Sequence, residues 1–192
     1  MTRFQSIAAI LTVGVFAAFA AATLRPAAAA DLSALDTRSD GTPLLNLIVH
    51  PEPLPAPEFR FFDKTGKAMT LANFRGRYTA VHFWATWCFP CRGELPTVDA
   101  LQDAIGEEKL AILALSLDRH GPEHVAEFYD EFGIRHLGVY MDERMNAARI
   151  LRVNGIPSTI FVDGEGREVA RVLGDRDWSE PEVIELVRRM VE

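Results

Sequence analysis

The sequence predicts an α/β fold, a sandwich in which helices flank a mixed central β-sheet. Short apolar stretches typical of strands alternate with segments whose apolar residues recur every three or four positions, as on a helix. Residues 110–117 are almost all apolar, which is typical of a central strand covered on both faces. Residues 158–162 and 168–173 flank an Asp-Gly-Glu-Gly turn and indicate a hairpin. This order of elements predicts the mixed sheet.

Turn residues and apolar runs set the bounds of each element. The expected strands cover 59–62, 69–71, 78–84, 110–117, 137–141, 158–162 and 168–173. The expected helices start near Pro90, Pro122, Glu143 and Ser179, and they end near Gly106, Phe132, Val153 and Val191. Ser179 is the expected N-cap of the last helix, because Glu182 three residues later completes a capping box.

The N-terminus has the pattern of a secretory signal peptide over residues 1–30. Arg3 precedes an apolar run from Ile7 to Leu24, and small residues lead to a cleavage site expected after Ala30. An uncleaved membrane anchor is the alternative, since the apolar run is at the short end of what spans a bilayer. Either way we expect the rest of the chain to be exported, to the periplasm or the outer face of the cytoplasmic membrane.

The exported part divides into a lead-in and one domain. Residues 31–58 contain four alternating prolines and are expected to form an extended, Pro-rich lead-in that resists regular structure. Packing of Leu44 to Val49 on the domain is an alternative for that part of the segment. Residues 59–192 have the size of one domain with its own core. The formal net charge of −7 argues against nucleic acid or an anionic membrane surface as the partner.

The chemistry of the chain is concentrated in Cys88 and Cys91, its only two cysteines. A pair that closes a loop of two residues adds little stability, so a purely structural disulfide is a poor explanation. A structural zinc site needs a second pair of ligands, and we find no paired ligand spacing among the five histidines, at 50, 82, 120, 124 and 136. The pair is therefore predicted to be a redox-active disulfide, with no other cofactor and no metal.

The position of the cysteines predicts different roles for them. Pro90 suits the first turn of a helix, which places the Cys88 sulfur over the helix N-terminus. Backbone N–H groups and the helix dipole stabilise a thiolate there, lowering its pKa from about 8.5. Cys91 follows one turn later on the same face and is expected to be shielded. We therefore predict that Cys88 attacks and that Cys91 resolves the mixed disulfide.

The stretch around the cysteines reads Phe83-Trp84-Ala85-Thr86-Trp87-Cys88-x-Pro90-Cys91-Arg92-x-Glu94-x-Pro96. This motif resembles the active site of exported thioredoxin-like reductases of the TlpA and ResA type. The resemblance continues through Leu71 to Gly76 and Gly155-Ile156-Pro157-Ser158-Thr159, and through Gly174 to Glu182 it is closer to TlpA. It implies a thioredoxin-like sandwich from about Pro51 to the C-terminus.

The resemblance also implies roles for residues outside the pair. Ile156 and Pro157 resemble the cis-proline loop that faces the disulfide, where the Ile156 backbone can pair with an extended substrate. Trp87, Phe89 and Pro90 complete the expected substrate-binding set.

Two further residues near the pair leave alternatives open. Glu94 matches an acid that exchanges a proton with the resolving thiol, although a solvated helix carboxylate is the alternative. His82 stands where thioredoxins carry Asp and TlpA-like proteins commonly Asn. It is either a proton relay or a hydrogen-bonded core histidine.

We therefore predict a monomeric thiol-disulfide oxidoreductase that reduces cell-envelope proteins. Phe89 and Pro90 place no histidine between the cysteines, which favours a reductant over a strong oxidant. The resemblance implies clients such as copper-site assembly factors of cytochrome oxidase or apocytochrome c, and a membrane thiol-electron transporter as donor.

Two alternative functions remain open. The first is a copper chaperone that uses Cys88, Cys91 and a histidine such as His120 or His136. The second is a thiol peroxidase, although the chain shows no Thr-x-x-Cys pattern with an activating arginine.

Overall fold

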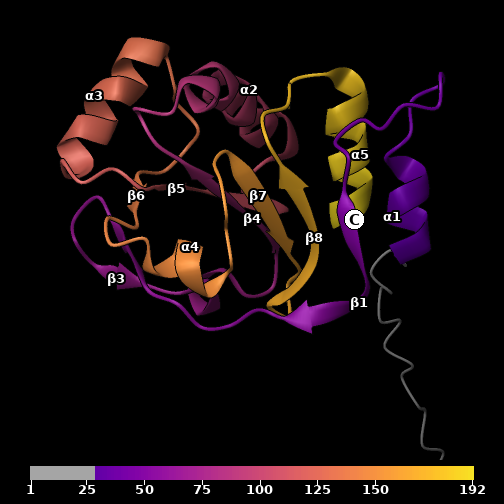
Figure 1. The fold of residues 1–192 in the computed structure, drawn as a ribbon, viewed down its shortest axis with the longest axis horizontal. Coiled ribbons are helices and arrows are strands. Elements are labelled where there is room, and N and C mark those ends of the chain that lie inside the picture. Colours follow the sequence, from indigo (N-terminus) through magenta and orange to yellow (C-terminus); the bar gives the residue numbers. More distant parts are fainter. Residues whose placement is uncertain (1–28) are drawn as a thin grey trace, which may run out of the picture.

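The computed structural model describes residues 29–192, and these form one mixed β-sheet with helices packed against it (Figure 1). The signal peptide or anchor expected over residues 1–30 lies outside the described residues, apart from Ala29 and Ala30 at the start of α1. None of the helices in this described part is long and apolar enough to cross a bilayer.

Eight strands within residues 29–192 form the sheet in the order β1-β8-β7-β4-β5-β6-β2-β3. The strands are β1 Ile48–Pro55, β2 Phe61–Asp63, β3 Ala68–Met69, β4 Tyr78–Trp84, β5 Leu110–Ser116, β6 Tyr140–Met141, β7 Ser158–Val162 and β8 Arg167–Leu173. The α-helices are α1 Ala29–Leu35, α2 Phe89–Ile105, α3 Pro122–Phe132, α4 Asn146–Ile150 and α5 Pro181–Val191. A short 3₁₀ helix covers Leu71–Phe74.

The sheet is mixed, as the sequence predicts. β4 runs parallel to β5 and antiparallel to β7, and β7 and β8 form the expected hairpin. All seven residues of β5 are buried, which confirms the central strand expected from its apolar run. The predicted α/β class, the mixed sheet and the hairpin are therefore correct.

The helices that cover the active-site strand lie along one side of the sheet. In Figure 1, α3, α2 and α5 follow one another from left to right, and α4 lies apart from them. Trp84 of β4 packs against Phe128 and Tyr129 of α3, with ring centroids 5.2 and 5.8 Å away. The Arg92 guanidinium of α2 lies over Phe128 and Phe132, which joins α2 to α3.

The expectation that the alternating prolines of residues 31–58 resist regular structure is wrong. Three of these prolines lie in β1, an edge strand that pairs antiparallel with β8. Prolines two residues apart place all their missing N–H groups on one side of a strand, which an edge can tolerate. The N–H of Ala56, one position out of phase with them, donates to the carbonyl of Gly166 across the pairing. The prolines therefore mark an edge strand.

The segment before β1 is also folded onto the domain. The buried Asp36 carboxylate accepts the backbone N–H groups of Leu45 and Leu47, each at 2.6 Å. Leu45 is fully buried, and Arg38 forms an ion pair with Glu180 at 2.5 Å beside the start of α5. Residues 31–58 thus belong to the packed structure of the domain.

The last helix begins later than its sequence suggests. α5 starts at Pro181 with Glu180 at the cap position, and the backbone of Ser179 instead donates to Asp177 at 2.9 Å. The capping box expected from Ser179 and Glu182 is wrong, because Pro181 suits the first helical position and sets the start of the helix there.

The region around α4 is shorter than expected. The strand expected over 137–141 is reduced to β6, and the helix expected over 143–153 is reduced to α4. Met145 and Arg152, with φ of 53° and 55°, adopt left-handed backbone conformations at the two ends. The carboxylate of Asp142 accepts the N–H groups of Asn146 and Ala148 and thereby caps this short helix.

Replacing Asp36 tests whether the segment before β1 contributes to stability. The Asp36→Ala variant leaves two N–H groups without their acceptor, so we expect the free energy of unfolding to fall by about 2 kcal/mol or more. Chemical denaturation measures this change. Glu52→Ala, at an exposed position of β1, is the control and should leave the denaturation midpoint unchanged. Equal stability of the two variants would contradict the packing role of Asp36.

Candidate active site

Cys88 and Cys91 form a disulfide at the start of α2. β4 ends at Trp84, and Cys88 is the N-cap of the helix that begins at Phe89. Pro90 occupies the second helical position, where its missing N–H costs no hydrogen bond, as expected. The strand therefore delivers the disulfide to the first turn of a 17-residue helix.

The two sulfurs have unequal surroundings. Cys88 is 6% exposed, whereas Cys91 is completely buried. The backbone N–H of Cys91 points at the Cys88 sulfur from 3.3 Å, as a donor at a helix N-terminus does. Negative charge developing on Cys88 would meet this donor and the helix dipole, while Cys91 is shielded. This asymmetry is the one that the sequence predicts.

The proline loop expected beside the disulfide lies there. The Ile156–Pro157 peptide bond is cis, and the Ile156 carbonyl oxygen is 3.8 Å from the Cys88 sulfur. Pro157 is buried, and Ile156 is partly exposed just before β7 begins. The structure therefore brings Ile156, Pro157 and Cys88 together.

Two large apolar side chains lie exposed around the disulfide. Trp87 is 65% exposed and Phe89 is 87% exposed, far more than such residues usually are. Pro90 is also exposed beside them. A groove of about 720 Å³ begins at Phe89 and Pro90 and continues past Gly93 and Thr97 to Arg176. These features give the disulfide an apolar surround open to a partner.

Glu94 lies one turn after Cys91 on α2 and is buried. Its Oε1 accepts hydrogen bonds from the indole Nε1–H of Trp178 and from the backbone N–H of Arg176. Burial raises the pKa of Glu94 to about 7, and the two hydrogen bonds only partly oppose this rise. The solvated-carboxylate alternative is therefore wrong, and Glu94 is poised to gain or lose a proton near neutral pH.

His82 is buried in β4 behind Glu94. Its Nδ1 is 2.9 Å from the hydroxyl of Thr159 on β7, and burial lowers its pKa to about 3. Its Nε2 is 4.0 Å from Glu94 Oε2, and among residues 29–192 neither atom has a hydrogen-bond partner. Since the imidazole is neutral at pH 7, the two side chains form a close pair of polar groups that is not an ion pair.

The sequence interpretation missed the partners that hold this site. Trp178 belongs to the stretch from Gly174 to Glu182 that carries the TlpA resemblance, but nothing in its spacing showed that it reaches Glu94. Asp118, two residues beyond β5, accepts the N–H and the hydroxyl of Thr86 at 2.9 and 2.7 Å. Thr86 stands two residues before Cys88, so Asp118 holds the segment that carries the disulfide.

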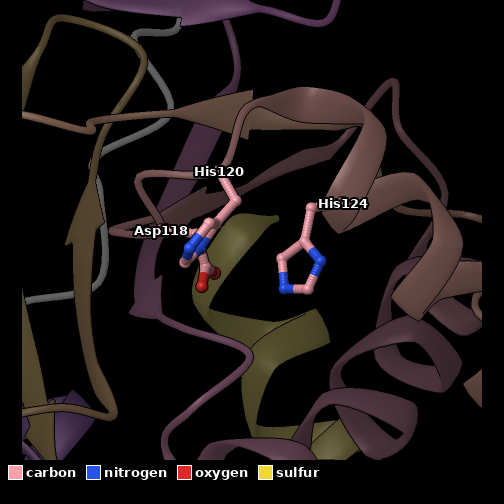
Figure 2. Close-up of side chains that lie close together, drawn as sticks. All are labelled: Asp118, His120 and His124. Carbon is pink, nitrogen blue, oxygen red and sulfur yellow. The ribbon is translucent and has the colours of Figure 1, made fainter.

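The statement that the histidines lack paired ligand spacing is wrong. His120 and His124 are four residues apart, and the structure brings both beside Asp118 (Figure 2). The signal was present in the sequence as Asp-x-His-x-x-x-His. This pattern combines one carboxylate with two imidazoles and contains no cysteine.

Comparison with known proteins agrees with this geometry. Residues 54–183 match the model of the AhpC/TSA family. The thiol-disulfide oxidoreductase ResA of Bacillus anthracis is 28% identical over 121 residues, which are 63% of this chain and 69% of that protein. The thioredoxin-like protein YneN of Bacillus subtilis is 29% identical over 113 residues, 58% of this chain and 65% of that protein.

Solved structures show the thioredoxin-like fold. The thioredoxin domain of a thiol-disulfide oxidoreductase from Bacteroides vulgatus superposes with a TM-score of 0.60 and 26% identity, over 72% of this chain and 96% of that one. A secreted thiol-disulfide isomerase from Corynebacterium glutamicum has a TM-score of 0.63 at 19% identity, over 80% and 95% of the two chains.

The raised pKa of Glu94 predicts a pH-dependent stability. The folded state holds the Glu94 proton more tightly than the unfolded state does. The contribution of this proton to the free energy of unfolding is therefore complete below about pH 4.5 and is lost as the pH rises to about 7. The free energy of unfolding of the wild type minus that of Glu94→Gln should therefore fall by up to about 3 kcal/mol across this range. His82 is present in both proteins, so the difference reports only the part of the pH dependence that depends on the Glu94 carboxyl.

Denaturation of both proteins at a series of pH values measures this difference. A difference that stays constant from pH 4.5 to 7 would show that Glu94 keeps an ordinary pKa.

Proposed function

We propose a reductive role for this chain, which belongs to the AhpC/TSA family and is a thioredoxin-like thiol-disulfide oxidoreductase. In this role it reduces disulfides of exported proteins through a mixed disulfide on Cys88. The observation that carries the proposal is the asymmetric pair at the start of α2, with a slightly exposed Cys88 and a buried Cys91.

The reaction transfers two electrons from the dithiol to the client. In the reduced protein the Cys88 thiolate attacks one sulfur of the client disulfide, so that a mixed disulfide forms and the other client sulfur leaves as a thiolate. Cys91 then loses its proton and attacks the Cys88 sulfur. This step closes the Cys88–Cys91 disulfide and releases the second client sulfur, which leaves the client reduced and this protein oxidised.

Glu94 is the proposed acceptor of the Cys91 proton. It lies one helical turn beyond Cys91, and its pKa of about 7 lets a carboxylate take the proton and later return it. His82 supports this role by position, since its Nε2 faces the second Glu94 oxygen from 4.0 Å. The neutral imidazole neither compels Glu94 to ionise nor repels its proton.

The surroundings of Cys88 suit an extended polypeptide. The Ile156 backbone, 3.8 Å from the Cys88 sulfur, is placed to pair with a client segment as an added strand. Trp87 and Phe89 offer exposed apolar surface beside Cys88 in the chain, and the groove beyond Phe89 gives side chains of the client a place to lie. The site therefore fits a protein substrate better than a small thiol.

The reductive direction and the place of action complete the proposal. The Phe89-Pro90 spacer contains no histidine that would stabilise the Cys88 thiolate, which favours a reductant. The pattern of residues 1–30 supports export to the periplasm, and similar structures include a secreted isomerase. Proposed clients are copper-site assembly factors of cytochrome oxidase or apocytochrome c, with a membrane thiol transporter as the electron donor.

A trapping experiment tests the proposed order of attack. The Cys91→Ser variant, expressed in the native envelope, should accumulate disulfide-linked complexes because the second step is blocked. Cys88→Ser should accumulate none. Non-reducing electrophoresis with mass spectrometry detects and identifies the complexes. If Cys91→Ser traps no protein while its Cys88 still reacts with a thiol reagent, the proposal of a protein client fails.

The role of Glu94 is tested by the rate of the second step. Glu94→Gln should slow closure of the Cys88–Cys91 disulfide on a preformed mixed disulfide by roughly 100-fold, since the proton acceptor is lost. In the wild type this rate should rise with pH through about 7 as Glu94 ionises, and the variant should lack that rise. Stopped-flow tryptophan fluorescence measures the closure.

Glu131→Gln, an exposed change on α3, is the matched control and should behave as the wild type. A wild-type rate and pH profile in Glu94→Gln would assign the buried acid a purely structural role.

A further inference from the structure

Three side chains with metal-binding atoms lie together beyond the end of β5, outside the proposed redox chemistry. Asp118, His120 and His124 each offer one ligand atom, and these atoms lie within 4.8 Å of one another. Figure 2 shows His124 at the start of α3 facing the other two side chains across a short space. The topology thus brings two imidazoles and one carboxylate to a single point.

The carboxylate of this cluster is held in place from behind. Asp118 is fully buried, and its Oδ2 accepts the N–H of Thr86 and the hydroxyl of Ser116, at 2.9 and 2.7 Å. Its Oδ1 accepts the Thr86 hydroxyl at 2.7 Å and keeps capacity for a further partner. Such supporting hydrogen bonds orient the ligand carboxylates of metal sites.

The two histidines are the movable members of the cluster. Both are exposed, and their ring centroids are 5.3 Å apart. The Thr86 hydroxyl has one proton, and it donates this proton to Asp118. At the 3.1 Å contact between the same hydroxyl and His124 Nε2, the imidazole N–H is therefore the donor. Figure 2 shows that Nε2 is the His124 ring nitrogen turned toward Asp118 and His120, so Nε2 becomes the ligand atom once its proton moves to Nδ1. The exposed His120 ring is free to turn.

We propose that Asp118, His120 and His124 form a binding site for a divalent transition-metal ion of the zinc or copper class. Two imidazoles and one carboxylate are the ligands that these ions prefer, whereas Mg²⁺ and Ca²⁺ favour oxygen alone. Ligands of a tetrahedral zinc ion lie about 3.3 Å apart, so modest rotation of the two exposed rings closes the present spacing. Three protein ligands leave one position for water or a partner's side chain.

The site is independent of the cysteine sulfurs. Neither Cys88 nor Cys91 belongs to the cluster, so the ion binds whether the disulfide is open or closed. This separates it from a copper chaperone in which the cysteines themselves hold the metal. The site is nevertheless adjacent to the redox centre, because Thr86 contacts both Asp118 and His124 two residues before Cys88.

Calorimetric titration of the oxidised protein with Zn²⁺ tests the proposal, since the closed disulfide removes the thiols as competing ligands. The full exported chain is used without a histidine tag. We expect one Zn²⁺ per chain, binding at least about tenfold weaker in His120→Ala and in His124→Ala. Mg²⁺ should not compete. His136→Ala, which removes an exposed histidine outside the cluster, is the control and should bind as the wild type.

Electron paramagnetic resonance of bound Cu²⁺ supplies a second readout. The spectrum should show hyperfine coupling to imidazole nitrogen, and this coupling should be weaker in His120→Ala and in His124→Ala. The absence of zinc binding by the oxidised wild type would overturn the proposal. Binding that survives loss of both histidines, with circular dichroism confirming the fold, would also overturn it. Because neither histidine is part of the dithiol chemistry, these results leave the trapping experiment with Cys91→Ser unaffected.

Discussion

The pairing of β4 with a strand on each side brings the segments that carry Cys88, Asp118 and Pro157 to one edge of the sheet. β4 runs parallel to β5 and antiparallel to β7, so its C-terminal end lies at the same edge of the sheet as the end of β5 and the start of β7. Cys88 follows the first of these, Asp118 the second, and Pro157 precedes the third. Residues far apart in the chain therefore meet because three buried strands share one register.

The same register determines the buried polar groups behind the disulfide. His82 and Thr159 are direct cross-strand partners, which explains the contact between their side chains. α2 then lays Glu94 over His82, and the chain after β8 brings Trp178 and Arg176 to the first Glu94 oxygen. An acid and an imidazole without full hydrogen bonding cost stability in a buried place. Retaining them is consistent with an acid that takes up and releases a proton near neutral pH.

The sequence predicted those parts of the fold that depend on local signals. The apolar runs, the hairpin and the start of α2 at the cysteines were correct because strand periodicity and proline position act over a few residues. β1 was missed because its prolines disfavour a strand locally, while pairing at the edge of the sheet tolerates them. The start of α5 was misplaced because Ser179 and Glu182 match a capping box in sequence, whereas Pro181 begins the helix.

The sequence predicts the residues that react at the site, but it does not predict the residues that hold them in place. Cys88, Cys91, Glu94, Ile156 and Pro157 carry a recognisable motif, and the structure brings the disulfide and the Ile156–Pro157 loop together. The contacts of Glu94 with Trp178 span 84 residues, and those of Thr86 with Asp118 span 32. No local spacing reports such contacts, because they are products of the tertiary fold.

A disulfide that opens and closes needs a frame that does not depend on its own bond. Cys88 is held by β4 on one side and by the first turn of α2 on the other, and both are built from backbone hydrogen bonds. Between them, Thr86 donates its N–H and its hydroxyl to the buried Asp118, which fixes the link. The position of the Cys88 sulfur is therefore set by groups other than its bond to Cys91. Because Asp118 also belongs to the proposed metal site, one carboxylate supports both features at this edge of the sheet.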